Sequence, residues 1–206
     1  DYTSALEKHN VTYRLHIDGA YGGFVYPFSN QKSNINFSNP KISSITIDAH
    51  KMLQAPYGTG IFVCRKGLIK NVLTKEAEYV EGMDLTLCGS RSGSNAVAVW
   101  MILFAYGPHG WFEKVSVLQM RTQFLCNELD QLNIPYFREP YMNIVTIDAK
   151  NINHALAERF DLVPPQHNSE NKWYKIVLMD HVEVEHLTTF IAQLKATMHV
   201  EKGITA

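Results

Sequence analysis

The run Ser-Ser-Ile-Thr-Ile-Asp-Ala-His-Lys (43–51) says more about the fold class of this chain than any other part of its sequence. Its β-branched residues predict a strand over residues 42–47, and a His-Lys pair follows that strand. An earlier run, Leu-His-Ile-Asp-Gly-Ala-Tyr-Gly-Gly-Phe (15–24), predicts a strand over residues 13–17 that ends at Asp18 and a small-residue loop. Short apolar strands of this kind are typical of the interior of an α/β sheet.

The two predicted strand ends carry complementary chemical groups. Asp18 supplies a carboxylate, and Lys51 supplies an amine next to His50. Ligands of α/β sheets bind outside the carboxyl ends of the strands. A lysine and a carboxylate in that position suit pyridoxal phosphate (PLP), whose aldehyde the lysine binds covalently while the carboxylate keeps the pyridine nitrogen protonated. The alternatives are an ordinary surface lysine and a strand-terminal aspartate that caps the next turn.

Small residues and a second loop extend this candidate site. Ala20 follows Asp18 by two positions, and its methyl group leaves room for a flat ring. The loop over residues 88–94 contains Ser90 and Arg91 and precedes a predicted helix. Hydroxyls, glycine amides and a guanidinium at a helix N-terminus form an anion site, although a serine N-cap alone also explains this segment.

Composition limits the class of protein. With 206 residues, 46% of them hydrophobic, the chain can build one large domain or two small ones. A net charge of −1 and a pI near 6.8 argue against nucleic acid or an anionic membrane as a partner.

The cysteines and histidines indicate neither disulfides nor a metal site. Cys64, Cys88 and Cys126 lack CxxC spacing, which favours reduced thiols in a cytoplasmic protein over disulfides or a zinc site, and the histidines show no metal-ligand spacing. The longest apolar runs are too short for a membrane span. Because the chain begins at Asp1 in what reads as a helix, we expect it to be part of a longer protein.

The rest of the sequence predicts a second, smaller unit. Helical periodicity and strand patterns predict further helices over residues 95–106, 111–132, 151–160 and 187–198, and further strands over residues 58–65, 143–147 and 173–179. Gly107 and Pro108 close the first of these helices, so we place a domain boundary there, between residues 1–108 and a small α+β domain over residues 109–206. We interpret Trp100, Met101, Phe104 and Tyr106 as core residues of the first helix.

Three runs in order resemble one enzyme family. They are His-Ile-Asp-Gly-Ala-Tyr-Gly-Gly (16–23), Ser-Ile-Thr-Ile-Asp-Ala-His-Lys-Met-Leu-Gln-Ala-Pro-Tyr-Gly-Thr-Gly (44–60) and Gly-Ser-Arg-Ser-Gly (89–93). Together they are similar to the group II PLP-dependent amino-acid decarboxylases, which act on tyrosine and other aromatic amino acids, aspartate or glutamate. The resemblance implies an α/β protein of PLP-dependent fold type I, the aspartate-aminotransferase-like fold. Residues 1–108 would be the C-terminal part of the PLP-binding large domain and residues 109–206 the small C-terminal domain.

The resemblance also assigns roles to individual residues. It implies that Asp18 pairs with the pyridine nitrogen, that Ala20 supports the ring and that Lys51 carries the cofactor beside His50, which contacts cofactor or substrate. It further implies roles for four residues elsewhere: Ser90 and Arg91 at the cofactor phosphate of a partner subunit, Tyr79 as the residue that protonates Cα, and Lys175 in place of the arginine that binds the substrate carboxylate. No metal is expected.

The implied function is the PLP-dependent decarboxylation of an L-amino acid to its amine, with aromatic substrates such as tyrosine favoured. The resemblance implies a cytoplasmic homodimer of amino-acid metabolism with its site at the subunit interface, and the family's large domain begins before this chain does. One alternative is a carbon–carbon lyase of the sphingosine-phosphate type. Others are a non-catalytic fragment of a longer decarboxylase and a purely structural or binding module.

Overall fold

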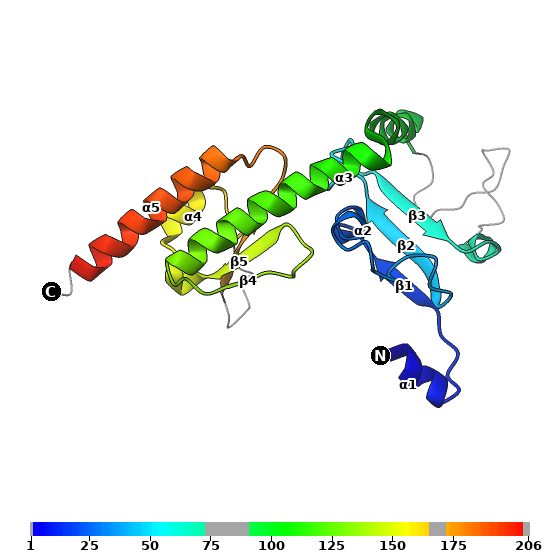
Figure 1. Cartoon of the computed structure of the whole chain (residues 1–206). Coiled ribbons are helices and arrows are strands. Elements are labelled where there is room, and N and C mark those ends of the chain that lie inside the picture. Colours follow the sequence, from blue (N-terminus) through cyan, green and yellow to red (C-terminus); the bar gives the residue numbers. More distant parts are fainter. Residues whose placement is uncertain (1, 73–90, 165–171, 204–206) are drawn as a thin grey trace. The chain divides into compact units, whose positions relative to one another are not determined.

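The structure is a computed structural model that describes residues 2–72, 91–164 and 172–203 (Figure 1). Contacts between residues divide the chain into two compact units, residues 1–108 and residues 109–206. Each unit is described by itself below. None of the helices in the described residues combines the length and the apolar content needed to cross a membrane.

The first unit is built around a three-stranded sheet. Its strands are β1 (Leu15–Asp18), β2 (Ile42–Asp48) and β3 (Gly60–Cys64), in the order β1-β2-β3 (Figure 1). β1 pairs with β2 in parallel, and β2 pairs with β3 antiparallel. The short helices of this unit are α1 (Tyr2–Lys8), α2 (Tyr26–Ser29) and the 3₁₀ turns Gly22–Phe24 and Ile69–Val72. The parallel pairing places the carboxyl ends of β1 and β2 at the same edge of the sheet.

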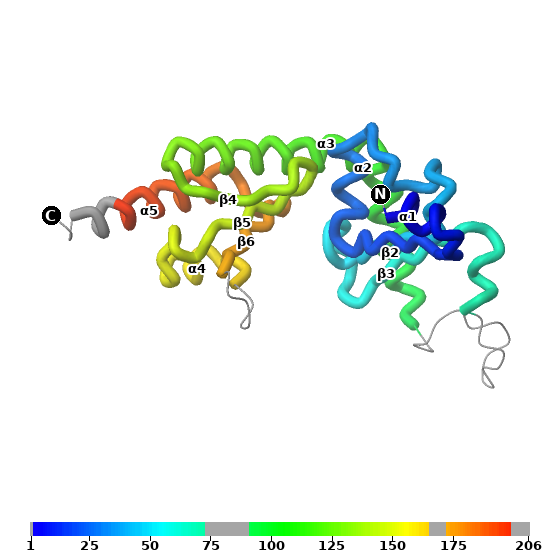
Figure 2. Tube along the Cα trace, turned by 90° about the horizontal axis from the view of Figure 1, so that it is seen from below, coloured from blue at the N-terminus to red at the C-terminus, as the bar shows by residue number. Residues whose placement is uncertain are grey.

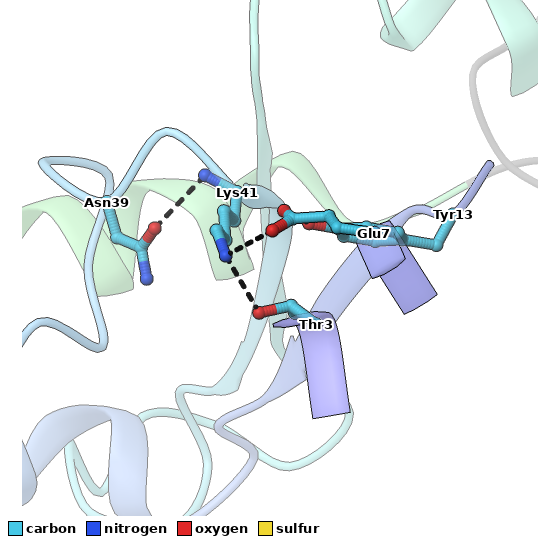
Figure 3. Close-up of polar contacts among 5 residues, drawn as sticks. All are labelled: Thr3, Glu7, Tyr13, Asn39 and Lys41. Atoms are coloured by element: carbon cyan, nitrogen blue, oxygen red, sulfur yellow. Dashed lines mark hydrogen bonds and ion pairs between the residues drawn. The ribbon is translucent and has the colours of Figure 1, made fainter. Parts of the chain in front are cut away.

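A polar cluster joins α1 to the start of β2 (Figure 3). The Lys41 ammonium donates to Glu7 Oε2 at 3.0 Å and to Thr3 Oγ1 at 3.1 Å, and the Tyr13 hydroxyl donates to Glu7 Oε1 at 2.6 Å. The hydrogen bond from Tyr13 and the contact with Lys41 lower the pKa of Glu7, and the same Glu7 contact raises the pKa of Tyr13. The carboxylate of Glu7 therefore joins α1 to Tyr13, six residues further on, and to Lys41, 34 residues further on.

We expect the stabilising effect of Glu7 to depend on pH. A carboxyl group whose pKa is lowered by folding stabilises the folded state above its unfolded pKa, here near 4.5, and loses that effect as the pH falls through its folded pKa. Glu7→Gln should therefore lower the thermal midpoint at pH 7, and the difference from the wild type should shrink towards pH 3. Glu139→Gln, at an exposed position of the second unit, is the control. A difference that does not change with pH would show that the charge of Glu7 is irrelevant.

One long helical segment, α3 (Gly93–Gln131), runs from the first unit into the second. It is interrupted at Gly107, whose φ of 58° and ψ of −178° are non-helical, and Pro108 follows. A residue with a side chain rarely adopts that backbone conformation, so glycine suits the break. The two helices predicted on either side of residues 107–110 are thus present as the two arms of α3.

The second unit packs helices on one face of an antiparallel sheet. Its strands β4 (Tyr136–Phe137), β5 (Ile144–Asp148) and β6 (Trp173–Val177) lie in that order, as Figure 2 shows. The C-terminal arm of α3, the short α4 (His154–Arg159) and α5 (Val184–Gly203) complete the unit (Figure 1). The core combines alternate strand residues with helix residues: Val145, Ile147, Tyr174, Ile176, Leu125, Leu129, Leu156, Phe190 and Leu194. Burial of these apolar side chains is the main stabilising contribution to this unit.

Two expectations about burial are wrong for the described residues. Trp100, Met101, Phe104 and Tyr106, predicted to be core residues, are 46–75% exposed, although the Trp100 and Phe104 rings stack at 5.2 Å between centroids. Phe62 and Val63 of β3, which the apolar run over residues 58–65 predicts to be buried, are also exposed. Successive strand residues point to opposite faces of the sheet, so the described residues cover neither side chain. Apolar periodicity predicts which face of an element is buried only where another element packs against that face.

Candidate active site

The candidate site lies where the loop after β1 meets the end of β2. Asp18 pairs in register with Thr46, and the backbone NH of Gly19 donates to the Thr46 carbonyl at 2.9 Å. Two residues further along, the backbone NH of Asp48 donates to the Ala20 carbonyl at 3.0 Å. The hydrogen-bonded pairing of the two segments therefore continues beyond β1 and fixes the residues that follow both strands.

Asp18 is held in a defined orientation at this edge. Its Oδ1 accepts a hydrogen bond from the backbone NH of Ala20 at 3.1 Å, and its side chain is exposed. The chain can turn this tightly because residue 19 is a glycine. A Cβ atom on Gly19 would crowd the backbone, at 3.0 Å from the Thr46 carbonyl oxygen and 3.1 Å from Gly23 Cα. The close approach leaves the exposed Asp18 carboxylate beside small residues.

Lys51 and His50 stand on the turn that follows β2. This turn is fixed by backbone hydrogen bonds from Lys51 to Asp48 at 3.1 Å and from Ala49, which is fully buried, to Thr59 at 3.0 Å. The Lys51 Nζ lies 2.7 Å from Asp48 Oδ2. The Lys51 side chain is 40% exposed, so its amine is accessible to a ligand.

The His50 ring is oriented by the same turn. Its Nδ1 lies 3.0 Å from the carbonyl oxygen of Thr59, and its Nε2 lies 4.0 Å from Asp48 Oδ2. A carbonyl oxygen only accepts, so Nδ1 carries the proton of this hydrogen bond. The Tyr57 ring packs against His50 at 5.2 Å between centroids. His50 is thus fixed through one nitrogen, and the other points towards the Asp48–Lys51 pair.

The predicted site residues fall into three groups. Asp18, Ala20, His50 and Lys51 lie on two segments that are joined through Asp48. Arg91 is exposed, two residues before α3, and Lys175 is exposed on β6 of the second unit, in register with Thr146. Tyr79 and Ser90 lie outside the described residues. Among the described residues, no group of three histidine, cysteine, aspartate or glutamate side chains is arranged to hold a metal ion.

The site also contains a contact that the assigned roles omit. Asp48 Oδ2 lies 2.7 Å from Lys51 Nζ and 4.0 Å from His50 Nε2, although neither the strand pattern nor the family resemblance assigns Asp48 a role of its own. Its signal in the sequence is an acid three residues before a lysine just beyond a strand. That spacing alone does not reveal whether the two side chains meet, because the answer depends on the turn between them.

The described residues fit PLP in their chemistry. Asp18 offers a carboxylate for a protonated ring nitrogen, the half-buried Ala20 has only a methyl side chain beside it, and Lys51 offers an amine for an aldehyde. Arg91 is a described residue suited to a phosphate, to which a guanidinium can donate two parallel hydrogen bonds.

Comparisons with known proteins agree with this reading. The model of the pyridoxal-dependent decarboxylase conserved domain matches residues 2–145. A tryptophan decarboxylase of Clostridium sporogenes is 55% identical over 194 residues, which are 94% of this chain and 46% of that protein. A probable L-tyrosine/L-aspartate decarboxylase of Methanocella arvoryzae is 32% identical over 195 residues, covering 88% of this chain and 49% of that protein. The chain therefore spans about half the length of these relatives.

The fold is shared with solved structures. The chain aligns with a sphingosine-1-phosphate lyase of Burkholderia pseudomallei at a TM-score of 0.77 and 17% identity, covering 96% of this chain and 47% of that chain. At this identity the likeness concerns the fold alone. The predicted PLP-dependent fold type I is confirmed.

Proposed function

This chain belongs to the pyridoxal-dependent decarboxylase family, and we propose that the full-length protein removes the α-carboxyl group of an L-amino acid as CO₂ and releases the amine. The observation that carries the proposal is the junction of two strand ends, where Asp18 and Lys51 stand on segments joined by the Asp48–Ala20 hydrogen bond. In this proposal residues 1–108 belong to the PLP-binding large domain and residues 109–206 form the small domain.

Each residue of the junction has a separate task. PLP, when bound, supplies an electron-accepting ring for the electron pair that remains on Cα after CO₂ leaves. Asp18 would hold a proton on the ring nitrogen by ion pairing, which strengthens that electron-accepting character. Ala20 would lie against the ring, and Lys51 would hold the aldehyde carbon between turnovers. His50, fixed through Nδ1 on the Thr59 carbonyl, would present Nε2 to the bound cofactor or substrate.

The other assignments complete the proposed enzyme. Lys175 would pair with the substrate carboxylate as a point charge, which orients it less strictly than the two-pronged contact of an arginine. Ser90 and Arg91 would reach the phosphate of the cofactor in a partner subunit, and Tyr79 would return a proton to Cα. The proposal includes a cytoplasmic homodimer and an N-terminal half that supplies the remaining contacts.

Aromatic amino acids are the proposed substrates. The support is the 55% identity to a protein named tryptophan decarboxylase, together with the weaker likeness to a probable L-tyrosine/L-aspartate decarboxylase. Pockets that hold a large ring discriminate against small acidic side chains, because those would leave a charge buried without a partner.

A substrate panel tests this proposal. We expect full-length protein with PLP to release CO₂ and amine from L-tryptophan or L-tyrosine with a kcat/KM at least roughly tenfold above that for L-aspartate or L-glutamate. Mass spectrometry of the products measures both. A preference for the acidic substrates would contradict the aromatic assignment. Aldehyde release without CO₂ would identify a carbon–carbon lyase, and a full-length protein that binds PLP but converts no substrate would contradict the decarboxylase.

A further inference from the structure

Asp48 contacts three of the four residues that make up the junction. Its backbone NH donates to the Ala20 carbonyl at 3.0 Å, its Oδ2 lies 2.7 Å from Lys51 Nζ, and the same oxygen lies 4.0 Å from His50 Nε2. The junction thus has one acidic side chain at its centre, in addition to Asp18 at the end of β1.

The Asp48 carboxylate is more restricted than the amine it holds. It is 23% exposed, on a residue that ends β2 and is hydrogen-bonded through its backbone on both sides. The Lys51 amine stands at the end of a four-carbon stem with many rotamers, on a side chain that is 40% exposed. Without an anchor, such an amine would spread over many positions at the edge of the sheet.

We propose that Asp48 is the positioning residue for Lys51 and holds its amine at the strand junction before the cofactor binds. This inference rests on the proposed function, in which Lys51 captures the PLP aldehyde. In that capture the Lys51 ammonium would first give one proton to water, Nζ would then bond to the aldehyde carbon, and the two remaining hydrogens would leave with the aldehyde oxygen as water. The step needs no oxidant or reductant. Because the bond can form only while Nζ lies near the aldehyde carbon, the rate of capture should rise with the fraction of time that the amine spends there.

The test measures capture of the cofactor, separately from catalysis. Cofactor-stripped full-length wild type, Asp48→Asn and Asp48→Glu are mixed with PLP, reduced with borohydride at timed intervals and digested, and the pyridoxyl group on the Lys51 peptide is followed by mass. We expect Asp48→Asn to slow capture roughly fivefold, the scale of one half-exposed charged contact. Asp48→Glu, which keeps the charge, should recover most of the rate.

The matched control is Glu128→Gln. Glu128 is 21% exposed and its Oε2 lies 3.3 Å from the amine of Lys195, which is 42% exposed, so the pair resembles Asp48–Lys51 in burial and charge. It belongs to the second unit and to none of the proposed machinery. We expect its loss to leave the rate of capture unchanged within about twofold.

A second readout separates positioning from general damage. In the cofactor-free proteins, acetic anhydride should label Lys51 faster in Asp48→Asn than in the wild type, measured against Lys195 in the same sample, while PLP capture slows. Asp48→Ser gives the same comparison if the asparagine variant does not fold, because serine also removes the charge and can cap a turn. Equal thermal midpoints would show that the variants are folded.

Two outcomes would count against different claims. If the wild type captures PLP on Lys51 and the charge-removing variants capture it at the same rate, Asp48 has no positioning role and only this inference is overturned. If the wild type carries its pyridoxyl group on another residue, the proposed function is wrong and the inference falls with it.

Discussion

Lys51→Ala should lower kcat/KM for the decarboxylation of the best amino-acid substrate by a factor of roughly 10³ or more. Deletion of a covalent catalytic residue has an effect of this scale. The reason is that alanine has no amine to hold the aldehyde carbon. The visible absorption of lysine-bound PLP should disappear in the same variant. Steady-state kinetics and an absorption spectrum of the purified full-length protein measure both effects.

Two further variants make the result specific. Lys51→Arg keeps the positive charge beside Asp48 but cannot form the covalent bond, so we expect it to be as inactive as Lys51→Ala. Lys195→Ala removes a lysine of similar exposure, 42% against 40%, that is also paired with a carboxylate. It should retain activity within about twofold. An active Lys51→Arg variant would show that only the charge of Lys51 matters.

Asp18→Asn should leave PLP bound while lowering kcat by roughly 10³-fold, the scale of one preorganised electrostatic contact. Asparagine keeps an oxygen that can accept the Ala20 backbone hydrogen bond, now 3.1 Å long, so the loop should retain its shape. It cannot supply the negative charge that keeps the ring nitrogen protonated. Cofactor content and single-turnover rates separate binding from chemistry.

Asp148→Asn is the matched control for that variant. Asp148 also ends a strand, and its Oδ1 accepts from the backbone NH of Lys150 at 3.0 Å, the same hydrogen bond to the second residue along the chain as at Asp18. Any decrease of kcat in Asp148→Asn would show how much activity is lost when such a turn is disturbed away from the proposed site. If Asp18→Asn turned over substrate as fast as the wild type, the negative charge of Asp18 would have no role in catalysis.

The strand ends could be predicted from the sequence because their signals are local. Alternation of β-branched residues predicted a strand over residues 42–47, and the structure places β2 at Ile42–Asp48. Gly107 and Pro108 predicted an interruption between two helices, and α3 is broken at Gly107. In both places the backbone preferences of a few neighbouring residues decide the outcome.

Features that depend on distant partners could not be predicted. Strand β4 has only two residues, Tyr136 and Phe137, and forms because β5 offers a free edge. The Glu7–Lys41 contact joins residues 34 positions apart. Exposure of Trp100 and Phe104 could not be read from the helical pattern, which shows an apolar face but not what covers it. The Asp48–Lys51 contact is local, but it could not be predicted either, because it depends on the dihedral angles of the turn and on the side-chain rotamers.

The location of the covalently held cofactor shows most directly whether Lys51 is the residue that binds PLP. Full-length protein saturated with PLP is reduced with borohydride and digested, and its peptides are mapped by mass spectrometry. We expect a single pyridoxyl group on Lys51, next to His50. A pyridoxyl group on another lysine, or none on a protein that decarboxylates amino acids, would contradict it.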